Sequence, residues 1–314
     1  IKMHMGVYNL FEDDKNPSSM SYKAQLALQE IASDMNKRIG YYEHGMLDRE
    51  TERLQLLKDA ETAISNEEFE VWFQPQVDYA HHRFFGAEAL VRWRHHARGF
   101  LSPAEFIPLA ERTGLIIPLT RSLMAQVNAQ MRPLFSKLPD GFHIGLNISV
   151  SHINAPTFID DCLHYQRGFE GKAVKLMLEI TEQEPLLLNG AVVDKLNTLH
   201  SRGFSIALDD FGTGYSGLSC LHELVFDYIK IDQSFVGRVT DEAPSSKLLD
   251  CVIEMARTLS LRIIAEGVET QAQLEYLNRQ NIHLLQGYYF WKPMPYVALV
   301  MLLLSKPKAR IVEE

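Results

Sequence analysis

The chain has 314 residues, a formal net charge of −9 and an apolar share of 46%. The length fits one large domain with a small appendage, and the apolar share is enough for a sizeable core. The acidic balance argues against bulk binding to nucleic acid or to an anionic membrane, because both require a basic patch. It allows a small phosphate ligand whose charge is neutralised locally by metal ions.

The cysteines indicate a reducing compartment, and the apolar runs are too short to span a membrane. Cys162, Cys220 and Cys251 are odd in number and far apart, so we expect no disulfide framework and a cytoplasmic location. The longest apolar run, Tyr296 to Leu304, is about half the length that spans a bilayer, and no membrane contact is expected from this segment. The chain opens at Ile1 without a signal peptide, so we expect it to be part of a longer protein whose anchoring stays open.

The first residues differ in character from the rest of the chain. In the segment 1–46, a turn-rich break at 12–17 is followed by helical spacing of apolar residues over 24–31. A charged stretch with a narrow apolar stripe predicts a linking helix over 47–66. The remaining residues, 67–308, are expected to form the main domain.

Eight short apolar runs alternate with amphipathic helix patterns in this main domain. The runs are Phe69–Phe73, Gly86–Val91, His143–Ile148, Val174–Ile180, Phe204–Leu208, Tyr228–Ile231, Arg262–Ala265 and Ile282–Leu285. Strands alternating with helices predict a parallel α/β sheet, and their number predicts a closed (β/α)8 barrel.

Local signals mark the ends of several helices. The segment Ser102–Glu105 is a capping box with proline at the first helical position, and Gly114 predicts the end of that helix. Thr270 with Gln273, three residues later, predicts another helix start. Further helices are predicted around Val192–Leu199 and Leu248–Leu259.

Polar residues lie within or directly after nearly every apolar run. They are Glu88, Asn147, Glu179, Asp209, Asp210, Lys230, Glu266 and Gln286. A single acid at a strand end is most often a helix N-cap or a solvated residue, but the ends of successive barrel strands meet at the catalytic face. Several carboxylates gathered there would repel one another without a cation. Ligands rich in oxygen and free of sulfur and imidazole favour a hard ion, Mg²⁺ or Mn²⁺.

Asp209 and Asp210 are the most informative of these residues. A glycine-rich stretch, Phe211–Leu218, follows them and predicts a tight loop rather than a helix start. An acid doublet allows one carboxylate to bridge two metal ions while its neighbour holds the second, an arrangement that serves in-line displacement at phosphorus. Lys230 is flanked by Ile229 and Ile231, so its side chain points to the opposite face from theirs and is placed to contact the attacking water or the developing charge.

The ordered motifs resemble those of the EAL domain family. They extend from about residue 50 to 300 and comprise nine segments: Phe73-Gln74-Pro75, Glu88-Ala89-Leu90-Val91-Arg92, Phe106–Glu111, Asn147-Ile148-Ser149, Glu179-Ile180-Thr181-Glu182, Asp209–Ser216, Lys230-Ile231-Asp232, Glu266–Glu269 and Gln286-Gly287-Tyr288. The resemblance implies a modified (β/α)8 barrel whose first strand runs antiparallel to the others. It also implies hydrolysis of one phosphodiester bond of cyclic di-GMP to linear pGpG, in bacterial second-messenger signalling.

Roles for individual residues follow from the same resemblance. It implies that two divalent ions, Mg²⁺ or Mn²⁺, are held, the first by Glu88, Asn147, Glu179 and Asp209, and the second by Asp209, Asp210 and Glu266. It implies catalytic roles for Lys230, beside the attacking water, for Glu266, and for Glu182, which would brace the loop after Asp210. The implied substrate contacts are Gln74, Leu90, Arg92, Asp232 and Gln286.

Resemblance alone gives expectations for the oligomeric state and for the N-terminal segment. The family implies a homodimer, with the loop Phe211–Ser216 near the interface. Residues 1–46 resemble the tail of a degenerate GGDEF domain, with Met5–Val7 similar to a late strand of that domain. The segment lacks the Gly-Gly-Asp-Glu-Phe motif, so we expect it to have no chemistry and to add a short helical segment, packed on the barrel or on a partner subunit.

Two other functions are compatible with the sequence. A receptor could bind cyclic di-GMP without cleaving it, although such proteins typically lose the acid doublet, the loop after it or the lysine, all of which stand here. Alternatively, a metal-dependent barrel could act on a different phosphodiester. Departures from the family pattern, such as Phe73 in place of tyrosine and His95-His96-Ala97 in place of the usual His-Pro after the signature, affect expected base contacts rather than catalysis.

Overall fold

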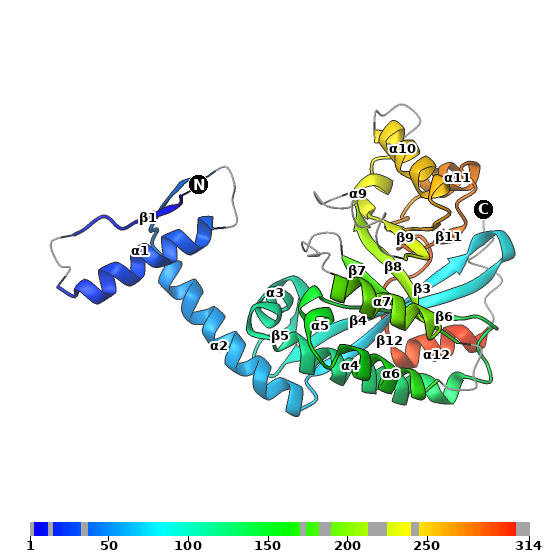
Figure 1. Ribbon diagram of the computed structural model, residues 1–314, viewed down its shortest axis with the longest axis horizontal. Coiled ribbons are helices and arrows are strands. Elements are labelled where there is room, and N and C mark those ends of the chain that lie inside the picture. Colours follow the sequence, from blue (N-terminus) through cyan, green and yellow to red (C-terminus); the bar gives the residue numbers. More distant parts are fainter. Residues whose placement is uncertain are drawn as a thin grey trace.

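The computed structural model describes residues 3–11, 15–32, 37–169, 174–181, 190–212, 225–239 and 245–305. It comprises a small N-terminal unit, a long helix and a barrel (Figure 1). None of the described helices combines the length and the apolar character that crossing a membrane requires.

The N-terminal unit is a helix packed on two short parallel strands. Strand β1 (Met5–Val7) pairs with β2 (Ile39–Tyr41), and α1 (Pro17–Ile31) connects them. Gly6 faces this helix so closely that a Cβ there would lie 2.0 Å from the Ala24 carbonyl oxygen. The predicted helix and the first strand are confirmed, whereas β2 was not predicted.

Helix α2 (Met46–Ser65) is the predicted linking helix. It packs against α1 at one end and against two barrel helices, α3 (Pro103–Thr113) and α4 (Ile116–Met131), further along. In Figure 1 it runs from the N-terminal unit, at the left, to the barrel. Helix α2 therefore contacts both α1 and the barrel.

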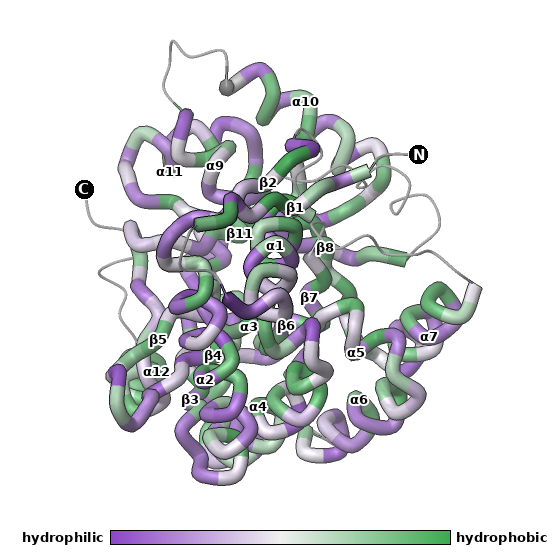
Figure 2. The backbone as a smooth tube through the Cα atoms, turned by 90° about the vertical axis from the view of Figure 1, so that its left-hand side faces the viewer, coloured by the Kyte–Doolittle hydropathy of each residue, from purple (hydrophilic) through white to green (hydrophobic). Residues whose placement is uncertain are grey.

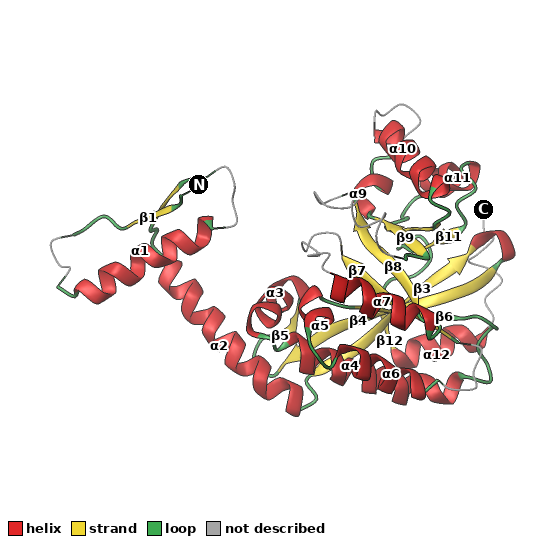
Figure 3. Cartoon of the chain, in the orientation of Figure 1, coloured by secondary structure: helices red, strands yellow, loops and turns green. Residues whose placement is uncertain are grey.

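Eight of the described strands close into a barrel. They are β3 (Phe69–Asp78), β4 (Arg83–His95), β6 (His143–Asn147), β7 (Lys175–Thr181), β8 (Ser205–Phe211), β9 (Tyr228–Ile231), β10 (Arg262–Ala265) and β11 (Leu284–Leu285). Figure 3 shows the strands in the centre with helices around them. The predicted (β/α)8 barrel is confirmed.

One strand of the barrel runs against the others. Strand β3 is antiparallel to both of its barrel neighbours, β4 and β11, whereas the other neighbouring strands pair in parallel. The reversal follows from the connection, because β3 and β4 are joined only by the 3-10 turn η1 (Tyr79–His81) and His82. A link this short can join antiparallel strands, whereas parallel strands need a crossover of a dozen or more residues.

The remaining elements surround the barrel. They are β5 (Gly99–Leu101), η2 (Arg132–Leu134), α5 (Val150–Asn154), α6 (Phe158–Arg167), α7 (Gly190–Ser201), α9 (Gln233–Val236), α10 (Ser245–Thr258), α11 (Gln271–Arg279), β12 (Met294–Pro295) and α12 (Tyr296–Ser305). The helices alternate hydrophilic and hydrophobic segments along their turns (Figure 2), as expected when one face packs on a sheet.

The predicted helix ends are confirmed. The Ser102 backbone N–H donates to the Glu105 carboxylate at 2.8 Å, and Gly114 ends α3 in the left-handed conformation, with φ 79°. A capping box of Thr270 and Gln273 begins α11.

The main core lies between the barrel wall and its helices. A smaller apolar cluster fills the barrel interior, formed by Phe85, Met177, Ala207, Tyr228, Ile264 and Leu284. His143 stacks on Phe85 within this region, with ring centroids 4.2 Å apart. The filled interior leaves the carboxyl ends of the parallel strands as the open face of the barrel.

Candidate active site

The polar residues predicted at the strand ends lie together at one end of the barrel. Ligand oxygens of Glu88, Glu179 and Asp209 lie within 4.8 Å of one another, and so do those of Asp209, Asp210 and Glu266. Asp209 belongs to both groups, as the bridging role expected of it requires. The Asn147 side chain joins the first group by donating to Glu88 at 2.7 Å.

A lysine lies at the centre of these acids. Lys230 is 0% exposed, and its Nζ lies 2.6 Å from Glu179, 2.7 Å from Glu266, 3.0 Å from Asp209 and 3.3 Å from Glu88. Burial opposes the lysine's charge, but attraction to these carboxylates prevails and raises its pKa well above the usual value. The ammonium group is therefore held charged inside the barrel.

The carboxylates exceed what one ammonium group can neutralise. Burial raises the pKa values of Glu179, Asp209 and Glu266, and Lys230 offsets this only in part. For Glu88, burial is outweighed by Lys230 and by donated hydrogen bonds, so its pKa lies below the usual value. A cluster with this excess of buried acid favours a cation.

The structure shows space and free ligand atoms for such a cation. Oε1 of Glu179 is buried and has no hydrogen-bond partner among the described residues. Gly145, on the neighbouring strand, makes room for this oxygen, because a Cβ there would lie 1.9 Å from it. An unpartnered buried carboxylate oxygen among further oxygen ligands fits a hard divalent ion. The acidic cluster could therefore hold metal.

Irregular backbone brings both members of the acid doublet to one pocket. Successive side chains of a regular strand point to opposite faces, but β8 shifts register between Leu208 and Phe211. Asp210 adopts a left-handed conformation, with φ 53°, and its backbone N–H donates to the Asp209 carboxylate at 2.8 Å. Burial, and then the charge of Asp209, raise the pKa of Asp210 to about 6.

A chain of glutamines supports Glu88 from the reversed strand. Gln286 donates to Glu88 at 2.7 Å and to Gln74 at 3.1 Å. Gln76 in turn donates to Gln286 at 2.7 Å. Gln76 was not singled out from the sequence, although strand alternation places it on the same face as Gln74.

An open pocket of about 290 Å³ lies over these groups. It is lined by most of the acids, by Lys230, and by four of the expected substrate contacts: Gln74, Leu90, Asp232 and Gln286. Asp232 also caps α9, because its carboxylate accepts the Ser234 N–H at 2.9 Å.

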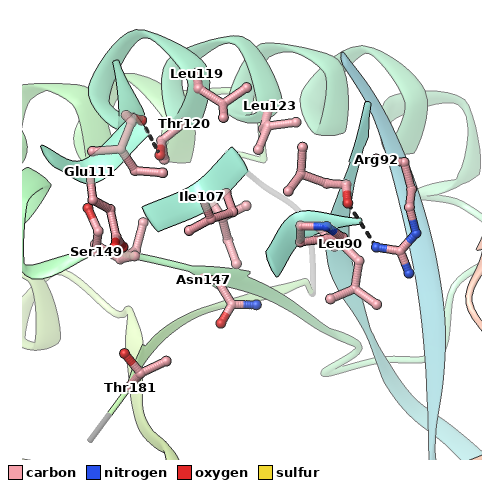
Figure 4. A pocket seen from close by; sticks show the side chains of 16 residues that line it. Leu90, Arg92, Ile107, Glu111, Leu119, Thr120, Leu123, Asn147, Ser149 and Thr181 are labelled. Carbon is pink, nitrogen blue, oxygen red and sulfur yellow. Dashed lines mark hydrogen bonds between the residues drawn. The ribbon is translucent and has the colours of Figure 1, made fainter. Parts of the chain in front are cut away.

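The fifth expected substrate contact, Arg92, lies in an adjoining apolar pocket of about 210 Å³ (Figure 4). Leu90 lines both pockets, so the two share a wall. Arg92 donates to the Val91 carbonyl at 2.8 Å, and its guanidinium carbon lies 5.8 Å from the centre of the Trp72 ring. The two adjoining pockets therefore form one site, in which the first pocket is acidic and the second is apolar and lined by Arg92.

Glu182 and most of the loop Phe211–Ser216 lie outside the described residues. The bracing role expected of Glu182 and the interface expected at this loop stay predictions.

Comparison with known proteins agrees with this geometry. The model of the EAL domain matches residues 57–293. The chain is 55% identical over 252 residues to the probable cyclic di-GMP phosphodiesterase PdeG of Escherichia coli, covering 80% of this chain and 50% of that protein. It is 40% identical over 233 residues to the cyclic di-GMP phosphodiesterase PdeL of the same organism, covering 74% of this chain and 64% of the relative. The chain thus spans about half to two thirds of these relatives.

Solved structures show the same fold. The structure described as the PaMucR phosphodiesterase in complex with c-di-GMP superposes with a TM-score of 0.71 at 33% identity, covering 78% of this chain and 99% of the other. The EAL domain of Mycobacterium smegmatis DcpA superposes with a TM-score of 0.62 at 26% identity, covering 76% of this chain and 96% of the other. From the matched model, the relatives and the fold, the chain belongs to the EAL domain family.

Proposed function

We propose that this chain hydrolyses one phosphodiester bond of cyclic di-GMP and releases linear pGpG. The observation that carries the proposal is Lys230, buried among four carboxylates beneath an open pocket. Relatives that are named cyclic di-GMP phosphodiesterases and a similar structure in complex with c-di-GMP support the choice of substrate.

We assign two metal positions to the acidic cluster. Glu88, Asn147, Glu179 and Asp209 would hold one ion, and Asp209, Asp210 and Glu266 the other. Oxygen ligands of this kind suit Mg²⁺ or Mn²⁺. When bound, such a pair supplies an activated water and stabilises the charge on the attacking and leaving oxygens.

In the proposed reaction, the side chains of this chain orient the attacking water and stabilise the charge that develops on the phosphate. The carboxylates keep Lys230 protonated, so its ammonium group donates a hydrogen bond to the attacking water and stabilises charge developing on the phosphoryl oxygens. Glu266, 2.7 Å from Lys230, is assigned to take up the proton that the water loses. Attack on phosphorus breaks the bond to one 3′ oxygen, which leaves as a hydroxyl when the proton taken up by Glu266 is returned to it, and the product is linear.

The substrate would lie across the two pockets. Arg92 is placed to pair with a phosphate, while Gln74, Leu90, Asp232 and Gln286 border the dinucleotide. The apolar pocket around Ile107 can accept a base, because planar rings bind among apolar side chains. A homodimer, with the loop Phe211–Ser216 near its interface, is part of the same proposal.

An Asp209→Asn variant tests the assignment. It should lose hydrolysis of cyclic di-GMP and bind Mn²⁺ more weakly while keeping the circular dichroism spectrum of the parent, because the shared carboxylate is replaced by a neutral amide. Asp160→Asn is the matched control, since Asp160 is exposed on α6. Undiminished hydrolysis by Asp209→Asn would remove the bridging carboxylate from the mechanism.

A further inference from the structure

Gln76 is a buried amide one layer deeper in the barrel than the acidic cluster. It is 0% exposed and pairs across β3 and β4 with Gly86, whereas Gln74 pairs with Glu88. Its Nε2 donates to Oε1 of Gln286 at 2.7 Å. The two residues are 210 positions apart in sequence, so this contact exists only in the folded barrel.

Two fixed acceptors determine the orientation of the neighbouring amides. Gln74 donates to the backbone carbonyl of Trp291 at 3.2 Å, so its own Oε1 faces Gln286. The Gln286 NH2 group meets that oxygen and an oxygen of Glu88. The Trp291 carbonyl can only accept, so Gln74 directs its NH2 group toward it and its Oε1 toward Gln286. Because Glu88 can also only accept, Gln286 must direct its NH2 group toward Glu88 and the Gln74 Oε1, and its Oε1 toward Gln76.

The Gln286 Oε1 therefore needs a donor, and Gln76 provides it. Gln286 is 4% exposed, so an unmet oxygen at this position would carry a desolvation penalty. Oε1 of Gln76 has no donor partner among the described residues, so its amide is held by the bond that its NH2 group donates to Gln286. A reversed Gln76 amide would set two oxygens against each other.

We propose that Gln76 is a positioning residue, which acts through Gln286 to hold the Glu88 carboxylate in the orientation that binds metal. This inference rests on the metal site assigned under the proposed function and adds a member to it. Groups that hold metal ligands in place typically account for about 10–100-fold in metal affinity. Gln76 touches neither the pocket nor the reacting atoms, so its effect must pass through Gln286.

Two substitutions separate orientation from packing. Gln76→Glu keeps the shape but offers only acceptors when ionised, so Gln286 must turn its NH2 group away from Glu88. Gln76→Met removes the donor, keeps a similar length and leaves the Gln286 Oε1 without the hydrogen bond from Gln76, while Glu88 and Gln74 still favour the parental orientation of Gln286. Gln126→Glu is the matched control, because the Gln126 amide also donates a hydrogen bond to a barrel strand, to the Phe69 backbone carbonyl at 2.9 Å, but lies outside the pocket.

The test measures Mn²⁺ affinity by calorimetry on metal-free protein, together with the melting temperature without metal. We expect affinity to fall about 10–100-fold in Gln76→Glu and less in Gln76→Met, with parental affinity in Gln126→Glu. In a Gln286→Ala background, neither Gln76 substitution should weaken Mn²⁺ binding further. Both substitutions act through the Gln286 amide, which this background lacks. If Gln76→Glu does not fold, the Mn²⁺ affinities of Gln76→Met and of the double variant Gln76→Met with Gln286→Ala test the positioning role.

The outcomes distinguish this inference from the proposed function. Parental Mn²⁺ affinity in both Gln76 variants, or an equal further loss in the Gln286→Ala background, would overturn the positioning role while leaving the metal site intact. A lowered melting temperature at parental affinity would also overturn it, since Gln76 would then serve packing alone. Failure of the parent chain to bind Mn²⁺ would overturn the metal site and this inference together.

Discussion

Nζ of Lys230 lies 2.6 Å from the Glu179 carboxylate, and both side chains are fully buried. A buried pair of this kind is strongly destabilised when one partner is removed, because the other charge is left uncompensated. Glu179 also keeps one oxygen without a partner among the described residues. The pair is therefore a structural element of the barrel, and its carboxylate is one of the ligands in the proposed metal site.

Replacement of Lys230 should affect hydrolysis far more than substrate binding. Lys230→Met should slow hydrolysis of cyclic di-GMP about 10²–10³-fold, the loss typical of one preorganised electrostatic contact. Single-turnover assays in Mn²⁺, with substrate affinity measured separately, check this. Lys175→Met is the control, since Lys175 is exposed at the start of β7. A parental rate in Lys230→Met would exclude the lysine from the reaction.

The same variant should depend more on metal for stability. Without Lys230, the surrounding carboxylates repel one another until a cation replaces the ammonium charge. Addition of Mn²⁺ should therefore raise the melting temperature of Lys230→Met by more than that of the parent. An equal increase in melting temperature in the two proteins would show that the Lys230 ammonium group does not help to neutralise these acids.

A methyl group at Gly145 should displace a proposed ligand. A Cβ at this position would lie 1.9 Å from Oε1 of Glu179, which must then move. Gly145→Ala should weaken Mn²⁺ binding at least about tenfold, as measured by calorimetry on metal-free protein. Gly190→Ala is the control, because nothing lies within 4 Å of a Cβ there. Equal affinities in the two variants would contradict the role given to Glu179.

Arg92 should act on substrate binding alone. Its side chain lines the apolar pocket and does not line the pocket over the acidic cluster. Arg92→Ala should raise KM for cyclic di-GMP about 10–100-fold, the worth of one hydrogen bond to a charged group, and leave Mn²⁺ affinity unchanged. Arg94→Ala is the control, because Arg94 pairs with Glu70 outside both pockets. Steady-state kinetics that gave the two variants the same KM would rule out this contact.

His143 should make the metal-free barrel sensitive to acid. Burial, and then the charge of Arg262, lower the pKa of His143 to about 4, whereas an unfolded histidine has a pKa of about 6.5. Between these values the unfolded state binds the proton and the native state does not, so stability falls as the pH falls. From pH 7.5 to 5.0 this group should remove about 2 kcal/mol from the free energy of unfolding.

Urea unfolding at the two pH values tests this expectation. His143→Gln should lose about 2 kcal/mol less than the parent over this interval, since it has no proton to gain. His96→Gln should behave as the parent does, because the His96 side chain is 63% exposed. If His143→Gln and the parent show the same acid dependence, His143 is not the group responsible.

The repeating pattern of the barrel could be predicted closely from sequence. Two predicted runs, Tyr228–Ile231 and Arg262–Ala265, have the bounds of β9 and β10. Buried parallel strands are continuous apolar runs, so a polar residue such as Lys230 or Glu179 stands out against them. Local chemistry was therefore enough to find both the strands and the residues that line their open ends.

Features that depend on contacts between distant segments were missed or came only from resemblance. The reversal of β3 depends on a turn at Tyr79–His82, where His82 takes a left-handed conformation, with φ 49°, in place of the glycine that usually signals such a turn. Gln76 and Gly145 gain their significance only from Gln286 and Glu179, which other strands supply. No local pattern shows such a relationship.

Incubation of the purified chain with cyclic di-GMP, separately with Mg²⁺, with Mn²⁺ and with EDTA, tests the central claim most directly. Products are resolved by chromatography, and ligand binding is followed in parallel by calorimetry. The account predicts linear pGpG with metal and intact substrate with EDTA. Intact cyclic di-GMP under all three conditions, bound but uncleaved, would contradict the hydrolase and make the chain a receptor.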